Sequence, residues 1–181
     1  MMRSRYKVGE DNQPTFITST IIEWIPVFTR KPYVDILLNS LSFCRQQKAL
    51  QVFAYVIMDN HLHLLAAGPN LSDTIRDFKR HTAREIIKLA EADQKYWLLQ
   101  QFKFYRERHK TGSDYQVWQE GFHPQEIMGE EMLSQKLEYI HGNPVRAGWV
   151  ERPEDWLYTS ARNYLEMEAV LEIDAIEDLE G

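Results

Sequence analysis

Two short apolar runs joined by a two-residue turn constrain the fold more than any other feature of the sequence. Residues 52–58 read VFAYVIM and residues 61–67 read HLHLLAA, and only Asp59 and Asn60 separate them. Runs of this length and spacing predict an antiparallel β-hairpin, although Asp-Asn is a weaker turn signal than Asn-Gly. The hairpin needs further strands and helices to cover it, which favours a mixed α and β fold.

The second run carries a histidine pair. Side chains alternate along a strand, so His61 and His63 are expected on one face while Leu62 and Leu64 enter the core on the other. Two imidazoles side by side are candidate ligands for one metal ion. Taken alone the pair is weak, and two histidines on a surface strand are the alternative.

The remaining pattern predicts a single α+β domain. Residues 15–22 alternate and are rich in β-branched side chains, as in a strand, and Pro32 fits the first turn of a helix. Ser72 is a plausible N-cap for a helix that runs to about Glu91. Two later elements are a possible strand at 115–119 and a helix at 130–142, which we expect to stop at Asn143 because it precedes Pro144.

Length and composition exclude several classes of protein. A chain of 181 residues with 44% hydrophobic side chains can form a hydrophobic core without disulfides or structural metal ions. Cys44 is the only cysteine, so an intramolecular disulfide and a cysteine zinc site are excluded. The N-terminal sequence lacks a signal-peptide run and no stretch is apolar enough to cross a bilayer, so we expect a cytoplasmic protein with no membrane partner.

The acidic charge is concentrated at one end. The net charge is −6, but residues 165–181 hold seven acids and no base, which leaves +1 on residues 1–164. We therefore expect a domain at 1–164 and an acidic extension at 165–181 that forms a short edge strand or lies across basic side chains in competition with DNA. Nucleic acid remains a candidate partner.

Basic side chains gather on the helix expected from Ser72. Four of them follow each other at intervals of four and form one stripe, opposite the apolar face. A surface of this kind can follow a DNA backbone, and a solvated helix face is the alternative. The DNA-binding candidates are Arg76, Lys79, Arg80, Arg84, Lys88 and, after the last helix, Arg146.

A second pair of candidate functional residues is Tyr139 and Asn143. They are four residues apart in the helix expected at 130–142 and its end, so they share a face. A phenol is a candidate nucleophile and an amide oxygen a candidate metal ligand beside two imidazoles. From the residues alone, a half-buried helix tyrosine is the alternative.

Several motifs together resemble one family. These are YVIMDNHLHLL at 55–65, Ser-x-x-Ile-Arg-x-Phe-Lys at 72–79, Val-Trp-Gln at 117–119, YIHGNPVRAGWV at 139–150 and Pro-x-Asp-Trp-x-x-x-Ser at 153–160. In this order they resemble the REP-associated tyrosine transposases, a branch of the single-tyrosine HUH transposases of the insertion sequence 200 type. One departure is Asp59, where proline is common in the family.

The resemblance implies a ferredoxin-like antiparallel sheet with helices packed on it, as in HUH nucleases. It implies that Tyr139 is the nucleophile and that His61, His63 and Asn143 hold Mg²⁺ or Mn²⁺. The expected function is a transposase that nicks and joins single-stranded or hairpin DNA through a 5′-phosphotyrosine, as a monomer or homodimer. The alternatives are a DNA-hairpin-binding protein without cleavage and a metal-dependent hydrolase that uses the histidine pair with Asp59.

Overall fold

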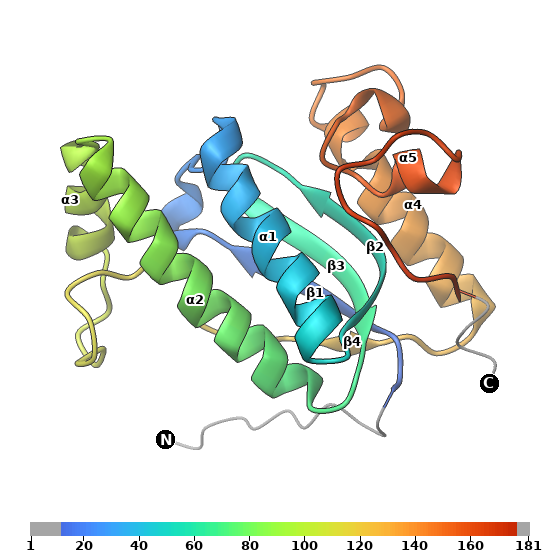
Figure 1. Cartoon of the computed structure of the whole chain (residues 1–181), viewed down its shortest axis with the longest axis horizontal. Helices are drawn as coiled ribbons and strands as arrows, with labels where there is room; N and C mark the ends of the chain where they lie inside the picture. The colour runs from blue at the N-terminus through green and yellow to red at the C-terminus, as the bar shows by residue number, and fades with distance from the viewer. Residues whose placement is uncertain (1–11, 177–181) are drawn as a thin grey trace.

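The computed structural model describes residues 12–176, and it follows the chain order β-α-β-β-α-β in its first part (Figure 1). This order predicts a ferredoxin-like sheet. The strands are β1 (Thr15–Thr20), β2 (Gln51–Ile57), β3 (His61–Ala67) and β4 (Gln125–Glu126). The helices are α1 (Lys31–Gln47), α2 (Leu71–Ala92), α3 (Tyr96–Phe104), α4 (Glu130–Arg146) and α5 (Ala161–Tyr164), with 3₁₀ turns η1 (Ile22–Trp24) and η2 (Pro153–Asp155).

The sheet confirms the fold class. Its order is β2-β3-β1-β4 and every pairing is antiparallel, with β3 and β1 in the centre. β2 and β3 form the expected hairpin, closed by a hydrogen bond of 2.8 Å from Met58 N to His61 O. In the β1–β3 register, Thr18 lies opposite His63 and Thr20 opposite His61.

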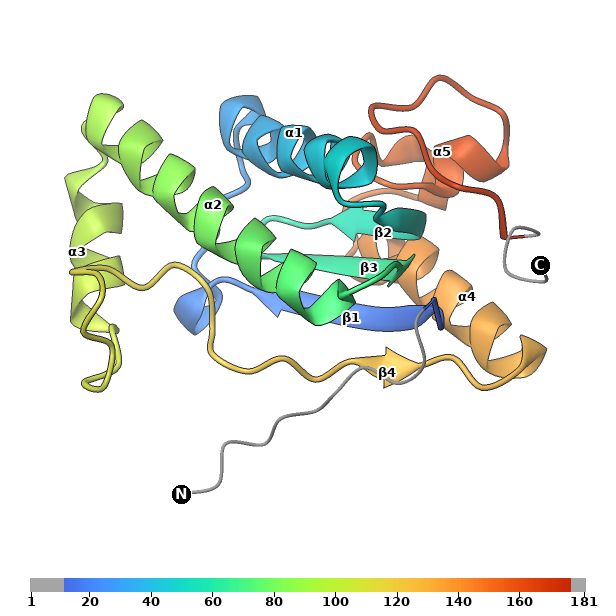
Figure 2. The ribbon, with the colours of Figure 1, turned by 60° about the horizontal axis from the view of Figure 1, so that its bottom comes forward.

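The two faces of the sheet belong to two separate cores. Leu62 and Leu64 of β3 pack in the larger core with α1, α2 and α3. Leu65 and Ala67, from the other face of the same strand, pack with Ile140 of α4 in the smaller core. Figures 1 and 2 show α1 and α2 side by side over one face and α4 on the other side. The alternation of β3 therefore turns its histidines toward the α4 side.

Helix α4 continues beyond the predicted end. It runs through Asn143 and Pro144 to Arg146, so the expected stop at Asn143 was wrong. A proline in a last turn removes only one backbone donor, and the Pro144 ring is buried, which offsets that loss. The carbonyl of Asn143 accepts from Ala147 N at 3.0 Å, so Tyr139 and Asn143 stay on one continuous helix.

Three other local predictions were wrong. Helix α2 begins at Leu71 after a left-handed Asn70, so Ser72 lies inside the helix and does not cap it. Residues 115–119 form no strand, and only Trp118 makes an isolated bridge, to Ile21. The first strand also ends earlier than predicted, at Thr20, because η1 follows.

The acidic extension packs at the open edge of β2. Residues 165–176 contain no strand, and Asp174 instead pins the segment to the sheet. Its N–H donates to Val52 O at 2.8 Å, and its carboxylate accepts from Val52 N at 2.8 Å and from the Arg45 guanidinium at 3.2 Å. The division at residue 164 stays a prediction. Residues 1–11, which include most of the N-terminal sequence tested for a signal peptide, and residues 177–181 lie outside the described part.

Replacing Asp174 by Ala is expected to lower the free energy of unfolding by about 2 kcal/mol. The change leaves the N–H of fully buried Val52 without an acceptor and Arg45 without its carboxylate. Urea denaturation measures it. The control is Asp35→Ala, which removes an exposed ion pair with Lys31 and should cost less than about 0.5 kcal/mol. Equal losses in the two variants would contradict the role of Asp174.

Among residues 12–176, no helix combines the length and the apolar character that crossing a membrane requires.

Candidate functional site

Strand β3 places the two imidazoles together, as the alternation predicts. The ring centroids of His61 and His63 are 4.7 Å apart, and the rings meet edge to face. His63 is 5% exposed, while His61 is partly open to solvent. β3 is a central strand of the sheet, between β2 and β1.

Neighbouring side chains fix the orientation of both rings. Asn60 Oδ1 lies 2.6 Å from His61 Nδ1, and the same amide donates from Nδ2 to Trp24 O at 3.1 Å. An amide oxygen only accepts, so His61 carries its proton on Nδ1 and keeps the lone pair of Nε2. His63 Nδ1 shares a hydrogen bond of 2.8 Å with Thr18 Oγ1 on β1. A bond of this kind at one ring nitrogen is how proteins orient metal-binding histidines.

Both histidines are held neutral. Burial lowers the pKa of His63 to about 3, helped by His61, Arg146 and Lys136 nearby. Burial also lowers the pKa of His61, and the Asp59 carboxylate opposes this shift. A metal binds the neutral ring, so the pair fits a divalent cation in both orientation and protonation.

Helix α4 brings the predicted nucleophile to the histidine pair. The Tyr139 ring lies 5.2 Å from the His63 ring and 5.9 Å from the Phe16 ring, centroid to centroid, and both contacts are edge to face. Tyr139 is 44% exposed, so a large substrate has access to its phenol. The side chain is therefore supported by the sheet on one side and open on the other.

Arg146 lies across the outer side of Tyr139. Its guanidinium carbon is 4.7 Å from the centre of the Tyr139 ring, and Nη2 donates to the Tyr139 carbonyl. Gly142 makes this possible, because a Cβ at that position would lie 2.6 Å from Arg146 Nη1. A guanidinium in this position can attract a phosphate to the Tyr139 side chain.

Asn143 lies one turn after Tyr139 on α4 and is partly buried. The helical spacing keeps it on the side of α4 that carries Tyr139. The candidate ligands are two imidazole nitrogens, from His61 and His63, and one amide oxygen, from Asn143. This set can bind Mg²⁺ or Mn²⁺, although both ions prefer a set of oxygen ligands alone. Its role as third ligand stays a prediction.

Comparisons of the whole chain with known proteins found similar sequences and structures. No protein-family model matches the chain. A Haemophilus influenzae protein assigned as a REP-associated tyrosine transposase is 29% identical over 114 residues, which are 61% of this chain and 58% of the relative. The chain therefore spans little more than half the length of that relative.

A solved structure of a REP-associated tyrosine transposase bound to a REP hairpin superposes with a TM-score of 0.64 at 15% identity, over 97% of this chain and 93% of the other. The resemblance to the REP-associated tyrosine transposases is confirmed. A Deinococcus radiodurans protein described as a transposase matches 77% of this chain and 95% of its own at 17% identity, with a TM-score of 0.43 that is too low to support an argument.

The basic stripe lies on the other side of the sheet from Tyr139. Arg76, Arg80, Arg84 and Lys88 are exposed on α2, in the layer opposite α4. Of these, only Arg84 has no carboxylate partner among residues 12–176, since Asp73, Asp77 and Glu85 engage the others. The sheet thus separates the stripe from Tyr139. Among the predicted DNA contacts, only Arg146 lies beside Tyr139.

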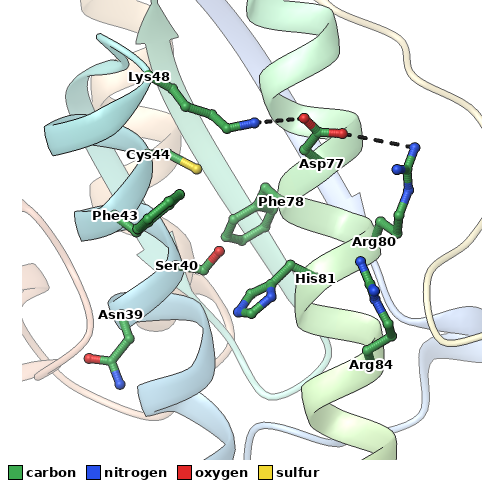
Figure 3. A pocket seen from close by; sticks show the side chains of 10 residues that line it. All are labelled: Asn39, Ser40, Phe43, Cys44, Lys48, Asp77, Phe78, Arg80, His81 and Arg84. Carbon is green, nitrogen blue, oxygen red and sulfur yellow. Dashed lines mark hydrogen bonds and ion pairs between the residues drawn. The ribbon is translucent and has the colours of Figure 1, made fainter.

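Two residues of the stripe line a groove between α1 and α2 (Figure 3). Phe43, Cys44 and Phe78 form its apolar part. Asp77 sits between Lys48, at 2.6 Å, and Arg80, at 3.9 Å, and holds both cations (Figure 3). The stripe is therefore partly neutralised and remains only a prediction as a DNA surface.

Lys79 lies on α2 beside the stripe, but its side chain has a different environment. Its ammonium donates to Gln119 O at 3.1 Å, beneath the loop that follows α3. Burial lowers the pKa of Lys79 to about 8, and Lys110 adds to this effect while Glu120 opposes it. A buried ammonium already bonded to a carbonyl makes Lys79 a poor candidate for a DNA contact compared with exposed Arg84.

Replacing Lys79 by Met is expected to change how stability depends on pH. Between pH 8 and 10.5 the unfolded wild-type chain binds the proton that folded Lys79 has lost, so wild-type stability rises with pH there. Lys79→Met lacks this rise. Its free energy of unfolding relative to that of wild type should therefore fall by about 2 to 3 kcal/mol between pH 7 and pH 10.5. Urea titrations at several pH values measure it, with exposed Lys88→Met as control. A pH-independent difference would contradict the low pKa.

One group of metal-ligand side chains forms in the described part of the chain, and it is not the histidine pair with Asp59. Glu107, His109 and Glu120 bring their ligand atoms within 4.8 Å of one another, but all three are exposed and Lys110 pairs with Glu120 at 2.6 Å. Asp59 instead lines a hollow with Trp149 and Trp156. The hydrolase alternative, which needs Asp59 at the histidines, gains no support.

The sequence pattern missed the residues that support the site. Thr18 orients His63, Asn60 orients His61, and Gly142 makes room for Arg146. Thr18 depends on the β1–β3 register, which no local signal reveals. Asn60 was interpreted only as a turn residue, although its position next to His61 was a usable signal.

Proposed function

We propose that this chain is a REP-associated tyrosine transposase that cleaves and rejoins single-stranded DNA through Tyr139. The observation that carries the proposal is the contact of the Tyr139 ring with His63, 5.2 Å between centroids, beneath the Arg146 guanidinium. A nucleophile, a cation and two metal-competent imidazoles thus meet on one open face. The solved structure that superposes on this chain holds a REP hairpin, which supports DNA as the substrate.

In the proposed reaction the Tyr139 phenol loses its proton and its oxygen attacks the phosphorus of a phosphodiester. The bond from phosphorus to the 3′ oxygen breaks, and that oxygen takes up a proton. The products are a 5′-phosphotyrosine and a free 3′-hydroxyl. Attack by a 3′-hydroxyl reverses the step, so the covalent link conserves the energy of rejoining and no nucleotide cofactor is consumed.

Each side chain has a distinct part in this scheme. Arg146 attracts the negative charge of the phosphate to the Tyr139 ring. Phe16 and His63 keep the Tyr139 ring in place from the sheet side. His61, His63 and Asn143 would hold the divalent cation, Mg²⁺ or Mn²⁺, which when bound polarises the phosphodiester.

The decisive experiment is a search for a covalent adduct. Purified protein is incubated with Mn²⁺ and single-stranded oligonucleotides that cover the sequences flanking its own gene, and the products are separated in SDS. A band that carries both protein and DNA is expected when the label lies on the 3′ side of the break, because the 5′ phosphate of that fragment is the one joined to Tyr139. A non-catalytic hairpin-binding protein, the second candidate, would retard the same DNA in native gels without forming this band.

A further inference from the structure

The outer side of α3 presents aromatic rings to solvent. Tyr96, Trp97 and Phe104 are 63%, 62% and 77% exposed. Trp97 and Phe104 are seven residues apart, so they project from the same side, about 10.5 Å apart along the helix axis. Gln100 lies between them. The opposite side anchors the helix in the larger core through Leu98, Leu99 and Phe102.

This aromatic face lies in the most basic part of the chain. Residues 95–110 hold five bases and one acid. Lys95, Lys103 and Arg108 are exposed and have no carboxylate partner within residues 12–176. These cations are not used by the fold, in contrast to those of the α2 stripe that pair with neighbouring acids.

We propose that this face is a binding platform for the unpaired bases of single-stranded DNA. Bases stack on exposed aromatic rings while cations track the phosphates, and this combination needs no sequence-specific contact. We define the α3 platform as Trp97 and Phe104, which stack, with Lys95, Lys103 and Arg108, which meet phosphates. Gln100 has the donors and acceptors to contact a base edge between the rings.

Charge favours DNA over a second copy of this chain as the occupant. A two-fold dimer through α3 would bring five bases and one acid of one copy against the same set of the other, which is repulsive. A polyanion with apolar base faces complements both properties of the surface. The inference rests on the proposed function only in taking DNA as the ligand.

The platform is remote from Tyr139. α3 is inserted between α2 and β4 and lies at the opposite end of the molecule from α4 (Figures 1 and 2). It would therefore hold a stretch of strand away from the cleaved bond and align the substrate along the molecule. Loss of the platform should weaken binding without removing the reactive residues.

The test is fluorescence anisotropy with a labelled dT₁₂ oligonucleotide at low salt, without metal. The double variant Trp97→Ala with Phe104→Ala should bind at least about tenfold more weakly than wild type, because each of the two stacked bases contributes about fivefold or more to the affinity. Trp97→Phe keeps a ring and should bind nearly as wild type does. Phe43→Ala, which removes a 56% exposed ring from α1, is the matched control and should bind normally.

A second oligonucleotide with abasic sugars separates stacking from charge. It should bind wild type more weakly than dT₁₂ does, and the double variant should bind both oligonucleotides alike. Unchanged binding of dT₁₂ by the double variant would overturn the platform. The platform would also be overturned if sedimentation showed wild type to be a dimer and the double variant a monomer, while both bound dT₁₂ with the same affinity.

Failure of the platform and failure of the proposed function are distinguishable. An adduct at saturating DNA, together with dT₁₂ binding that ignores Trp97 and Phe104, would reject the platform alone. Binding that depends on the rings, without any adduct, would keep the platform and reject cleavage.

Discussion

Replacing Tyr139 by Phe abolishes the covalent adduct while the protein still binds DNA: this is the largest effect we expect. The change removes one oxygen atom and keeps the ring that contacts His63 and Phe16, so the fold and the surface are preserved. Without the nucleophile, cleavage should fall by about a thousandfold or more. The yield of adduct in SDS gels measures it against native-gel binding of the same oligonucleotide.

The matched control for this result is Tyr158→Phe. Tyr158 is another phenol of the same chain, packed against Trp156, and its loss should leave the adduct unchanged. An adduct of wild-type yield from Tyr139→Phe would refute the proposed chemistry. Gly142→Ala adds a finer test, because its Cβ would displace Arg146 from the ring and slow cleavage without removing the phenol.

Replacing His61 by Ala should weaken Mn²⁺ binding by at least about a hundredfold. Outer partners of metal ligands alone contribute 10- to 100-fold to affinity, so a direct ligand contributes at least as much. We prefer His61 to His63 because it is more exposed and its truncation opens a smaller cavity. Isothermal titration calorimetry with Mn²⁺ measures the change, and the metal dependence of adduct formation should be lost with it.

The exposed group Glu107, His109 and Glu120 requires a second control. Weak Mn²⁺ binding there would mask the loss at His61, so the titration is repeated with Glu120→Gln in both proteins. His81→Ala, at an exposed histidine of α2, should bind Mn²⁺ as wild type does. Equal Mn²⁺ affinity of Glu120→Gln proteins with and without His61 would refute the ligand assignment.

The sequence predicted those features that depend on short-range pattern. The hairpin at 52–67 follows from two apolar runs and a short turn, and the common face of His61 and His63 follows from strand alternation alone. The spacing of Tyr139 and Asn143 fixed their common helical face in the same way. The ferredoxin-like order came from the family resemblance, because no local pattern specifies which strands pair.

The features that failed depend on distant contacts. The helix end at Pro144 could not be predicted, because the burial of the proline ring and the neighbouring carbonyl bonds outweigh the local preference for a stop. The basic stripe was recognised correctly as a face of α2, but its position on the far side of the sheet from Tyr139 depends on how two layers pack. Lys79 was predicted as a DNA contact beside that stripe, but its ammonium is bonded to the carbonyl of Gln119, forty residues later in the chain.

The alternation of β3 also determines where the chain tolerates insertions. One additional residue that shifted β3 by one register would turn His61 and His63 toward α1 and α2, and Leu62 and Leu64 toward α4. Reactive face and core would be lost in a single step. The α3 segment, which extends the loop between α2 and β4, changes in length without shifting any strand. Homologues should therefore vary in length around α3 and keep the spacing of the hairpin fixed.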